Sequence, residues 1–209
     1  LIAQPDIGQT LLVIFCWAVL IFTSGINIYI LLAIFIAGAS LLTYLIIYVP
    51  RFDYIQGRIF SFFNRETGTH NFQSDKAIES ITSGGFFGKG IGEGVLKNRV
   101  PEAHTDYIIS VISEEFGVVA IMLILLLFLI LIYMVFKKIS FETNDKVKLI
   151  LIGSISLILM QATIHIGVNI RLFPTTGMTL PFLSYGGSSI ISTSILAGII
   201  LNLTKRKIT

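Results

Sequence analysis

The sequence contains few charged residues. Only 13% of its 209 residues are Asp, Glu, Lys or Arg, whereas 54% are hydrophobic, and the mean hydropathy is +0.86. Soluble globular domains carry about 25% charged residues, so this composition excludes that class and indicates a membrane protein. The charges form a few clusters and sum to +3. Nucleic acid is therefore not expected as a partner, because binding it needs a concentrated basic patch.

Cysteine is almost absent as well. The single Cys16 lies inside an apolar run, which excludes a disulfide framework, a CxxC motif and a cysteine metal site. The three histidines are too scattered to predict a metal site. The Gly186-Gly187-Ser188 segment lacks the pattern of a serine nucleophile elbow. We therefore predict neither a metal site nor a nucleophilic serine from these residues.

Long runs with few charges predict the fold class. A run of about 18 residues crosses a hydrocarbon core of roughly 30 Å, and in lipid it must be helical because no water is available to the backbone. The predicted spans are residues 7–24, 26–49, 107–136, 147–170 and 186–203. We therefore expect an all-α polytopic membrane protein with five transmembrane helices and extracytoplasmic loops at residues 50–106 and 171–185.

Positive charge predicts the orientation of these spans, because Lys and Arg concentrate at cytoplasmic helix ends. Basic residues flank the third and fourth spans and follow the fifth, at Lys137, Lys138, Lys146, Lys148, Lys205, Arg206 and Lys207. The C-terminus is therefore expected in the cytoplasm and the start of the chain outside. No signal peptide precedes the first span, so we expect this chain to be the C-terminal part of a larger protein.

The long loop at residues 50–106 carries seven basic and seven acidic residues. Its aromatic residues, which lie beside Arg51, Arg58 and Arg65, suit a segment in the lipid headgroup layer. Ser74 is expected to cap a short helix that ends at Gly84-Gly85. The loop is longer than most connections in compact proteins, which favours a functional role.

Six glycines crowd residues 83–94. This segment is not a nucleotide phosphate loop, because Lys89 is followed by Gly90 where Ser or Thr is required. Two interpretations stay open. The glycines could form a bend that lets backbone approach backbone, or their N–H groups could line a site for an anionic headgroup.

Polar residues form a stripe on each of two predicted spans. The third span has Asp106, Ser110, Ser113, Gly117 and, close by, Glu114 and Glu115; the fourth has Gln161, His165 and Asn169, followed by Arg171. Such stripes predict a hydrated cavity that opens outward, with hydrogen bonding between helices as the alternative. Glu114 and Glu115 are expected to face helices that this chain does not contain.

Asp106 has two possible roles at the start of the third span. Its carboxylate would cap the helix by accepting hydrogen bonds from the first N–H groups. A carboxylate at the membrane boundary beside His104, opposite Arg and Lys residues, could equally deprotonate a sugar hydroxyl. Physical chemistry alone favours neither role.

Four longer elements of the sequence form a recognisable set, namely Pro101-Glu-Ala-His-Thr-Asp-Tyr107, Glu114-Glu-Phe-Gly117, Asn169 and Pro174-Thr-Thr-Gly-Met-Thr-Leu-Pro-Phe-Leu-Ser-Tyr-Gly-Gly-Ser-Ser189. They resemble the SEDS family of bacterial cell-wall synthases, and most closely its cell-division members. The resemblance covers nearly the whole chain. It implies a ten-helix fold, of which this chain looks like helices six to ten.

The resemblance implies a peptidoglycan glycosyltransferase that polymerises lipid II at the division septum of the bacterial cytoplasmic membrane, with Asp106 as catalytic base. Substrate-binding residues would be Glu102, His104, Thr105, Lys97, Arg99, Arg171, Ser184, Gly186, Gly187 and Ser188, beside a polar cavity of Glu114, Glu115, His165 and Asn169. The implied partners are lipid II, membrane lipid, a class B penicillin-binding protein and other division proteins. The resemblance leaves the cofactor open and is compatible with a divalent cation such as Mg²⁺.

Two other functions remain as alternatives, a lipid II flippase and a non-catalytic scaffold that recruits the penicillin-binding protein. We expect the 209 residues alone not to polymerise glycan, because polar residues such as Glu114 and His165 would lack partners. Pro181 and Gly186-Gly187 predict that the loop before the fifth span folds back next to Asp106, within about 20 Å.

Overall fold

The fold is described by a computed structural model that covers residues 6–63, 69–95 and 100–205. Helices make up its regular structure, and no strand occurs in these three ranges. The elements are α1 (Ile7–Thr23), α2 (Ile28–Tyr48), the short 3₁₀ helix η1 (Pro50–Phe52), α3 (Asp53–Phe63), α4 (Thr69–Gly84), α5 (Ile108–Phe141), α6 (Asp145–Asn169) and α7 (Gly187–Thr204).

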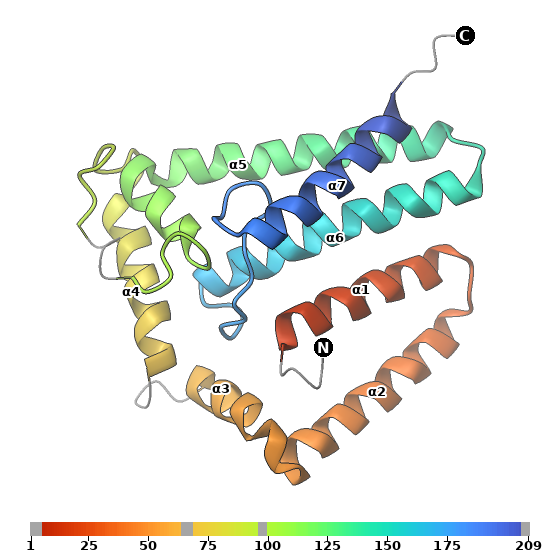
Figure 1. Cartoon of the computed structure of the whole chain (residues 1–209), viewed down its shortest axis with the longest axis horizontal. Coiled ribbons are helices and arrows are strands. Elements are labelled where there is room, and N and C mark those ends of the chain that lie inside the picture. The colour runs from red at the N-terminus through yellow and green to blue at the C-terminus, as the bar shows by residue number, and fades with distance from the viewer. Residues whose placement is uncertain (1–5, 64–68, 96–99, 206–209) are drawn as a thin grey trace.

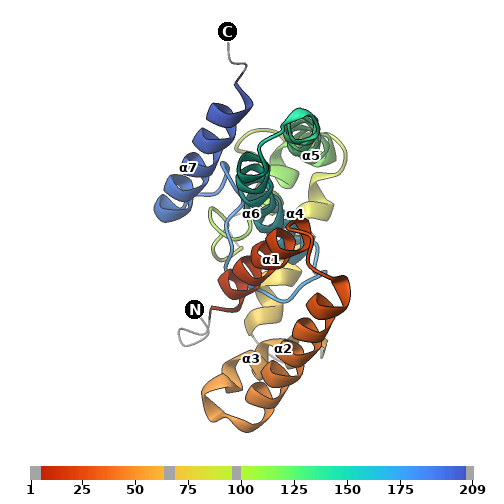
Figure 2. The same ribbon diagram turned by 90° about the vertical axis from the view of Figure 1, so that its right-hand side faces the viewer.

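The long helix α6 is the centre of the arrangement. It packs against α1, α5 and α7, and these helices run lengthwise through the molecule (Figures 1 and 2). Half of its most apolar stretch is buried inside the protein, compared with 6% for α2 and for α5. α2 diverges from α1 and leads into α3, while α4 crosses the end of the bundle beside the start of α5 (Figure 1).

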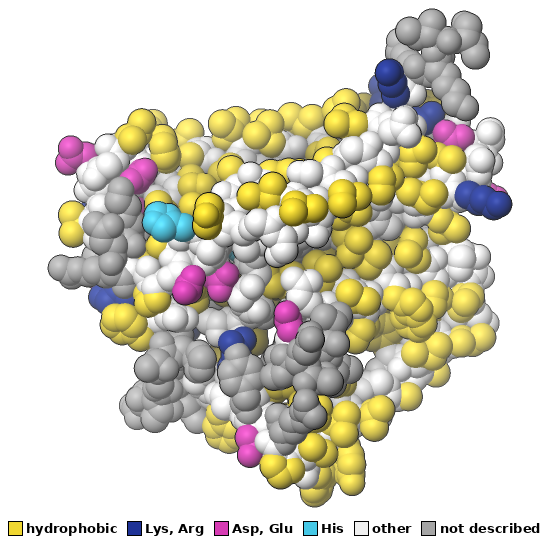
Figure 3. All heavy atoms as spheres, viewed as in Figure 1, with side chains coloured by type: hydrophobic (Ala, Val, Ile, Leu, Met, Phe, Trp, Pro, Cys, Tyr) yellow, Lys and Arg dark blue, Asp and Glu magenta, His cyan; other side chains and the backbone are white. Residues whose placement is uncertain are grey.

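Length and hydropathy identify a polytopic membrane protein. In the described ranges, four helices are long and apolar enough to cross a membrane, namely α2, α5, α6 and α7, and α1 is a shorter apolar helix. Hydrophobic side chains cover these helices along their length (Figure 3), as expected for a surface in contact with lipid. The predicted all-α class is confirmed. Each predicted span falls on one helix, and the residues at which the bilayer begins and ends stay a prediction.

Side chains at the helix starts explain where several elements begin. Asp6 accepts a hydrogen bond from the N–H of Gln9 at 3.0 Å, and Asn144 accepts one from the N–H of Lys146 at 3.0 Å. Both are N-caps of the usual kind. The predicted cap at Ser74 is wrong, because α4 begins at Thr69 and Ser74 is buried within the helix. The predicted end at Gly84 is confirmed.

The glycine-rich segment is inserted into a break in α5. At Gly117 the backbone leaves the helical conformation, with φ 76° and ψ −176°. The N–H groups of Lys89 and Gly90 donate to the carbonyls of Glu114 and Glu115, at 2.9 and 3.0 Å. On the other side of the break, the N–H groups of Val118 and Val119 donate to the carbonyls of Gly85 and Phe86, at 3.0 and 3.2 Å. The segment thus satisfies backbone groups that the break would leave unpaired.

Glycine is required at three of these positions. A Cβ on Gly84 would lie 1.9 Å from the Ser113 oxygen, one on Gly88 would lie 2.1 Å from the Glu115 oxygen, and one on Gly117 would lie 2.2 Å from the Phe86 oxygen. All three neighbours are backbone atoms and cannot turn aside. The interpretation in which the glycines let backbone approach backbone is therefore confirmed.

Gly117→Ala should destabilise the protein strongly. The added methyl overlaps a carbonyl, at a cost of about 1–3 kcal/mol, and alanine at positive φ costs roughly 1–2 kcal/mol more. We expect a clear fall in the melting temperature of the full-length protein in detergent. Gly38→Ala in α2 is the matched control, because nothing lies within 4 Å of its added Cβ. Equal melting temperatures for the two variants would contradict the close approach at Gly117.

Candidate functional site

Two loops meet at the end of the bundle where α5 begins and α6 ends. Three consecutive backbone carbonyls of the loop before α5 each accept one hydrogen bond from the segment around the α6–α7 loop. The His104 carbonyl accepts from the Tyr185 N–H at 2.9 Å, the Thr105 carbonyl from the Ser184 hydroxyl at 2.7 Å, and the Asp106 carbonyl from the Asn169 amide at 3.0 Å. We call this set of bonds the carbonyl clamp. The expected return of this loop to Asp106 is confirmed.

The α6–α7 loop is itself held from several sides. The Ser184 hydroxyl accepts from the Leu180 N–H at 2.8 Å, and a His165 ring nitrogen lies 2.7 Å from the Met178 carbonyl. The Gln161 amide donates to the Thr179 carbonyl and hydroxyl at 3.0 and 3.1 Å. Polar residues of α6 therefore position the loop, which agrees with the alternative of hydrogen bonding between elements.

The carboxylate of Asp106 does not cap α5. The N-cap residue is Tyr107, and no side chain makes a capping hydrogen bond there. The capping role considered for Asp106 is therefore wrong. The side chain is half-buried, and burial raises the pKa of the Asp106 carboxyl above its ordinary value. The nearby Glu102 carboxylate raises this pKa further, while Arg58 and a hydrogen bond from Thr105 lower it without cancelling the rise.

Glu102 forms the turn that carries Asp106. Its carbonyl accepts from the N–H groups of Thr105, Asp106 and Tyr107 at 3.1, 3.0 and 3.3 Å, and its carboxylate accepts from the Thr105 hydroxyl at 3.0 Å. Its φ of 55° lies in the left-handed region, as do those of Arg171 (59°) and Phe182 (67°). Non-glycine residues rarely adopt this conformation, and such strain is concentrated at functional sites.

Arg58 is a site residue that the sequence did not reveal. It lies on α3, where its guanidinium donates to the Thr175 carbonyl at 2.7 Å, and its charge acts on Asp106 and Tyr107. Burial lowers the pKa of the Arg58 guanidinium from its ordinary value, and the nearby Tyr107 and Asp106 oppose this shift. The only sequence feature that could have indicated its position is its spacing from Ile55, which places the two residues one helical turn apart on the same face. We had expected it in the headgroup layer.

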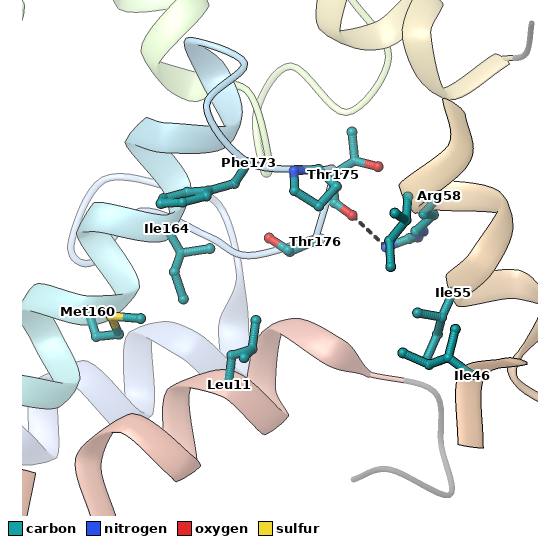
Figure 4. Close-up of a pocket in the computed structure, with 11 residues that line it drawn as sticks. Leu11, Ile46, Ile55, Arg58, Met160, Ile164, Phe173, Thr175 and Thr176 are labelled. Atoms are coloured by element: carbon teal, nitrogen blue, oxygen red, sulfur yellow. Dashed lines mark hydrogen bonds between the residues drawn. The ribbon is translucent and has the colours of Figure 1, made fainter. Parts of the chain in front are cut away.

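An apolar groove opens beside Arg58 (Figure 4). It measures about 290 Å³ and is enclosed by α1, α2, α3, α6 and the first residues of the α6–α7 loop. Aliphatic and aromatic side chains form most of its wall, with the Arg58–Thr175 hydrogen bond at one side (Figure 4). The lining residues are Leu11, Ile46, Ile55, Arg58, Ile59, Met160, Ile164, Phe173, Pro174, Thr175 and Thr176.

The polar stripe of α5 does not line a hydrated cavity. Ser110, Ser113 and Glu114 are completely buried against α4 and the glycine-rich segment. The Ser80 hydroxyl donates to the Ser110 carbonyl and approaches a Glu114 carboxylate oxygen at 3.1 Å. These residues were expected to face water, and that prediction is wrong, because α4 and the glycine-rich segment fold back over them.

Glu114 and Glu115 find partners inside the chain. Glu114 accepts from the Lys89 ammonium at 3.3 Å and from the Val95 N–H at 3.0 Å, and Glu115 accepts from the Gly92 N–H at 3.2 Å. Glu114 is completely buried within this chain, so the expectation that it faces helices outside the chain is wrong. Both residues anchor the glycine-rich segment, and for half-buried Glu115 the expectation stays a prediction.

The remaining predicted residues divide into three groups. Thr105, Ser184 and Asn169 belong to the carbonyl clamp, and exposed His104 lies beside Asp106 in the chain. Gly186 and Gly187 begin α7, and Ser188 lines a separate pocket between α1, α6 and α7. Lys97 and Arg99 lie outside the described residues. The clamp thus brings together part of the predicted substrate site.

The raised pKa of Asp106 predicts that replacing this carboxylate by a neutral side chain stabilises the folded protein. Replacing a carboxylate that caps a helix would destabilise it. A carboxyl whose pKa is raised by folding is more stable when protonated, so ionised Asp106 destabilises the folded protein at neutral pH. Asp106→Asn in the full-length protein should therefore raise the melting temperature at pH 7. The difference should shrink as the pH falls towards the ordinary value of 3.8. A lower melting temperature for the variant at pH 7 would contradict this account.

Comparisons with known proteins agree with this architecture. The model of the FtsW, RodA and SpoVE family, described as cell cycle protein, matches residues 1–208. A relative from Caulobacter vibrioides, named probable peptidoglycan glycosyltransferase FtsW, is 35% identical over 99% of this chain and 52% of its own length. Stage V sporulation protein E of Bacillus subtilis is 34% identical over 98% of this chain and 56% of its own length.

A solved structure is also similar. It carries the description "Structural coordination of polymerization and crosslinking by a peptidoglycan synthase complex", with a TM-score of 0.76 and 30% identity over 96% of this chain and 55% of that chain. This chain spans about half the length of the curated relatives that it matches. Because the family model matches nearly every residue, this chain belongs to the FtsW, RodA and SpoVE family, also called SEDS, and it is most like FtsW.

Proposed function

We propose that the full-length protein is a peptidoglycan glycosyltransferase that polymerises lipid II during septal cell-wall synthesis. The observation that carries this proposal is the half-buried carboxylate of Asp106, held by its backbone and placed within the electrostatic influence of Arg58. Relatives named probable peptidoglycan glycosyltransferase FtsW support the same activity.

In the proposed reaction, Asp106 acts as general base. Its carboxylate takes the proton of the acceptor sugar 4-hydroxyl while that oxygen forms a bond to the anomeric carbon of the donor. The bond between this carbon and the diphosphate oxygen breaks, and the lipid diphosphate leaves as an anion. A general base works best with a pKa raised towards the working pH, which burial and Glu102 supply.

The leaving group explains why a single carboxylate suffices. Glycosidases need a second carboxyl group to protonate a poor leaving group. A diphosphate leaves without a proton if positive charge stabilises it. Arg58 is the described cation whose charge acts on Asp106, and it also borders the apolar groove. The groove is suited to part of a lipid chain.

A divalent cation would fit this site in one way. In the described ranges, no group of three or more His, Cys, Asp or Glu side chains comes together. Mg²⁺ is often bound by one or two carboxylates together with substrate phosphates. Glu102, whose charge acts on Asp106, would be the protein ligand, so that the Asp106 carboxylate would stay free to accept the proton, and the ion would add positive charge for the departing diphosphate.

The proposed orientation places the Asp106 site outside the cytoplasmic membrane. Ion pairs between Lys138 and Glu142 and between Lys148 and Asp145 lie at the opposite end of α5 and α6. Clustered lysines favour the cytoplasmic side. We also propose a class B penicillin-binding protein and other division proteins as partners, which the similarity to a peptidoglycan synthase complex supports.

Asp106→Asn in the full-length protein tests the proposed activity. Asparagine has nearly the same size but cannot accept the proton, so lipid II polymerisation should fall by about 10²- to 10⁴-fold. Polymerisation is measured in detergent at matched protein concentration. Asp145→Asn at the other end of the bundle is the control and should retain full activity. The inactivity of the 209 residues alone stays a prediction, to be checked in the same assay.

Near-normal glycan synthesis by a folded Asp106→Asn variant would contradict the proposal. For the wild-type protein, lipid II movement across a bilayer without glycan formation would favour the flippase. Neither lipid movement nor glycan formation, with recruitment of the penicillin-binding protein retained, would favour the scaffold. A flippase requires a polar cavity within the membrane, and the α5 stripe does not line one, because it is buried under α4.

A further inference from the structure

A small polar pocket lies next to the apolar groove, and Arg58 lines both. It is formed by α3, α4 and the start of the α6–α7 loop, and its polar lining comes from Arg58, Ser61, Ser74 and Arg171. Two guanidinium groups in one pocket are the arrangement that proteins use to bind phosphate, because each offers a planar fork of donors. The pocket therefore has the chemistry of an anion site.

Arg171 is held in a strained and incompletely satisfied state. Its backbone has φ 59°, in the left-handed region. One end of its guanidinium pairs with the Asp75 carboxylate on α4. Its other terminal nitrogen is buried and, within the described part of the chain, has no hydrogen-bond partner. A buried donor without a partner costs free energy, and an anion in the pocket would remove that cost.

The Asp75 side chain is the more exposed member of this pair. Its exposed fraction is 53%, compared with 15% for Arg171. Exposed ion pairs contribute little to stability, so a stronger anion can displace the carboxylate. The pocket is about 10 Å³, which is room for about one water molecule, so a phosphate enters only when side chains that line the pocket move.

The pocket adjoins the apolar groove. Arg58, Pro174 and Thr175 line both cavities. The groove, about 290 Å³, is close to the lower limit of roughly 300 Å³ for ligand pockets, so it accommodates part of a chain. A cationic pocket at the end of an apolar groove is complementary to a diphosphate that carries a hydrocarbon chain.

We propose that Arg58 and Arg171 bind the diphosphate of the lipid-linked donor. In the empty site the Asp75 carboxylate forms an ion pair with Arg171, and the diphosphate displaces that carboxylate when it binds. The inference rests on the proposed glycosyltransferase function and adds an internal competitor for the substrate anion. In the empty site Asp75 neutralises one of the two cations. In the occupied site both guanidinium groups face the diphosphate, next to the base at Asp106.

The test is equilibrium binding of inorganic pyrophosphate and of farnesyl diphosphate to the full-length protein in detergent. Arg171→Gln should weaken binding of both by about 10- to 100-fold, as for a lost hydrogen bond to a charged group. Asp75→Asn should tighten it by about two- to fivefold, because an exposed competing pair is removed. In the double variant, Asp75→Asn should have no further effect.

The matched controls are Lys148→Gln and Asp145→Asn, which break an ion pair at the opposite end of the bundle and should leave binding unchanged. The opposite signs expected for Asp75 and Arg171 are decisive. If both substitutions weaken binding alike, the Arg171–Asp75 ion pair only holds α4 against the α6–α7 loop, and the proposal is overturned. It is also overturned if neither substitution changes binding in proteins with wild-type melting temperatures.

Two further measurements complete the design. Arg171→Lys retains the charge without the planar fork and should bind with intermediate affinity. Farnesyl diphosphate should bind the wild-type protein more tightly than pyrophosphate, and equal affinities would remove the groove from the proposal. Binding requires no chemistry, so these outcomes are independent of the polymerisation assay on Asp106→Asn, and either proposal can fail alone.

Discussion

The site depends on the carbonyl clamp. Three successive carbonyls, from His104 to Asp106, are bound by donors from the segment around the α6–α7 loop. The clamp uses only backbone oxygens of this turn, so the position of Asp106 is set without engaging its carboxylate. The proposed base is thus oriented through its backbone and keeps its side chain available for a proton, as general base catalysis requires.

The contacts around the break in α5 stabilise the start of this helix, next to the carbonyl clamp. α4 and the glycine-rich segment cover the polar stripe of the first turns of α5, and buried Glu114 connects Ser80, Lys89 and Val95. Buried carboxylates are stable only when their oxygens are bonded. This network therefore fixes the start of α5 relative to α4, and α4 also carries Asp75 towards Arg171.

The charged groups of the site have opposing effects on the pKa of Asp106. Burial and Glu102 raise the pKa of Asp106, while Arg58 lowers it. Left-handed backbone at Glu102, Arg171 and Phe182 adds conformational strain around the same turn. Each of these features costs stability, and such costs persist where function requires them. The tight packing of α4 and α6 around the site offsets them.

The sequence by itself determined the membrane class, the helical nature of the chain, the family and the return of the loop after α6, because hydropathy, glycine, proline and long motifs are local signals. It did not reveal the role of Arg58, the start of α4 or the partners of Glu114. Helical periodicity shows which face of α5 is polar, but not what covers that face. The contacts that decide this, such as Arg58 with Thr175 and Arg171 with Asp75, join residues about a hundred positions apart. Only the tertiary structure brings such residues together, because chain packing rather than local pattern sets their distance.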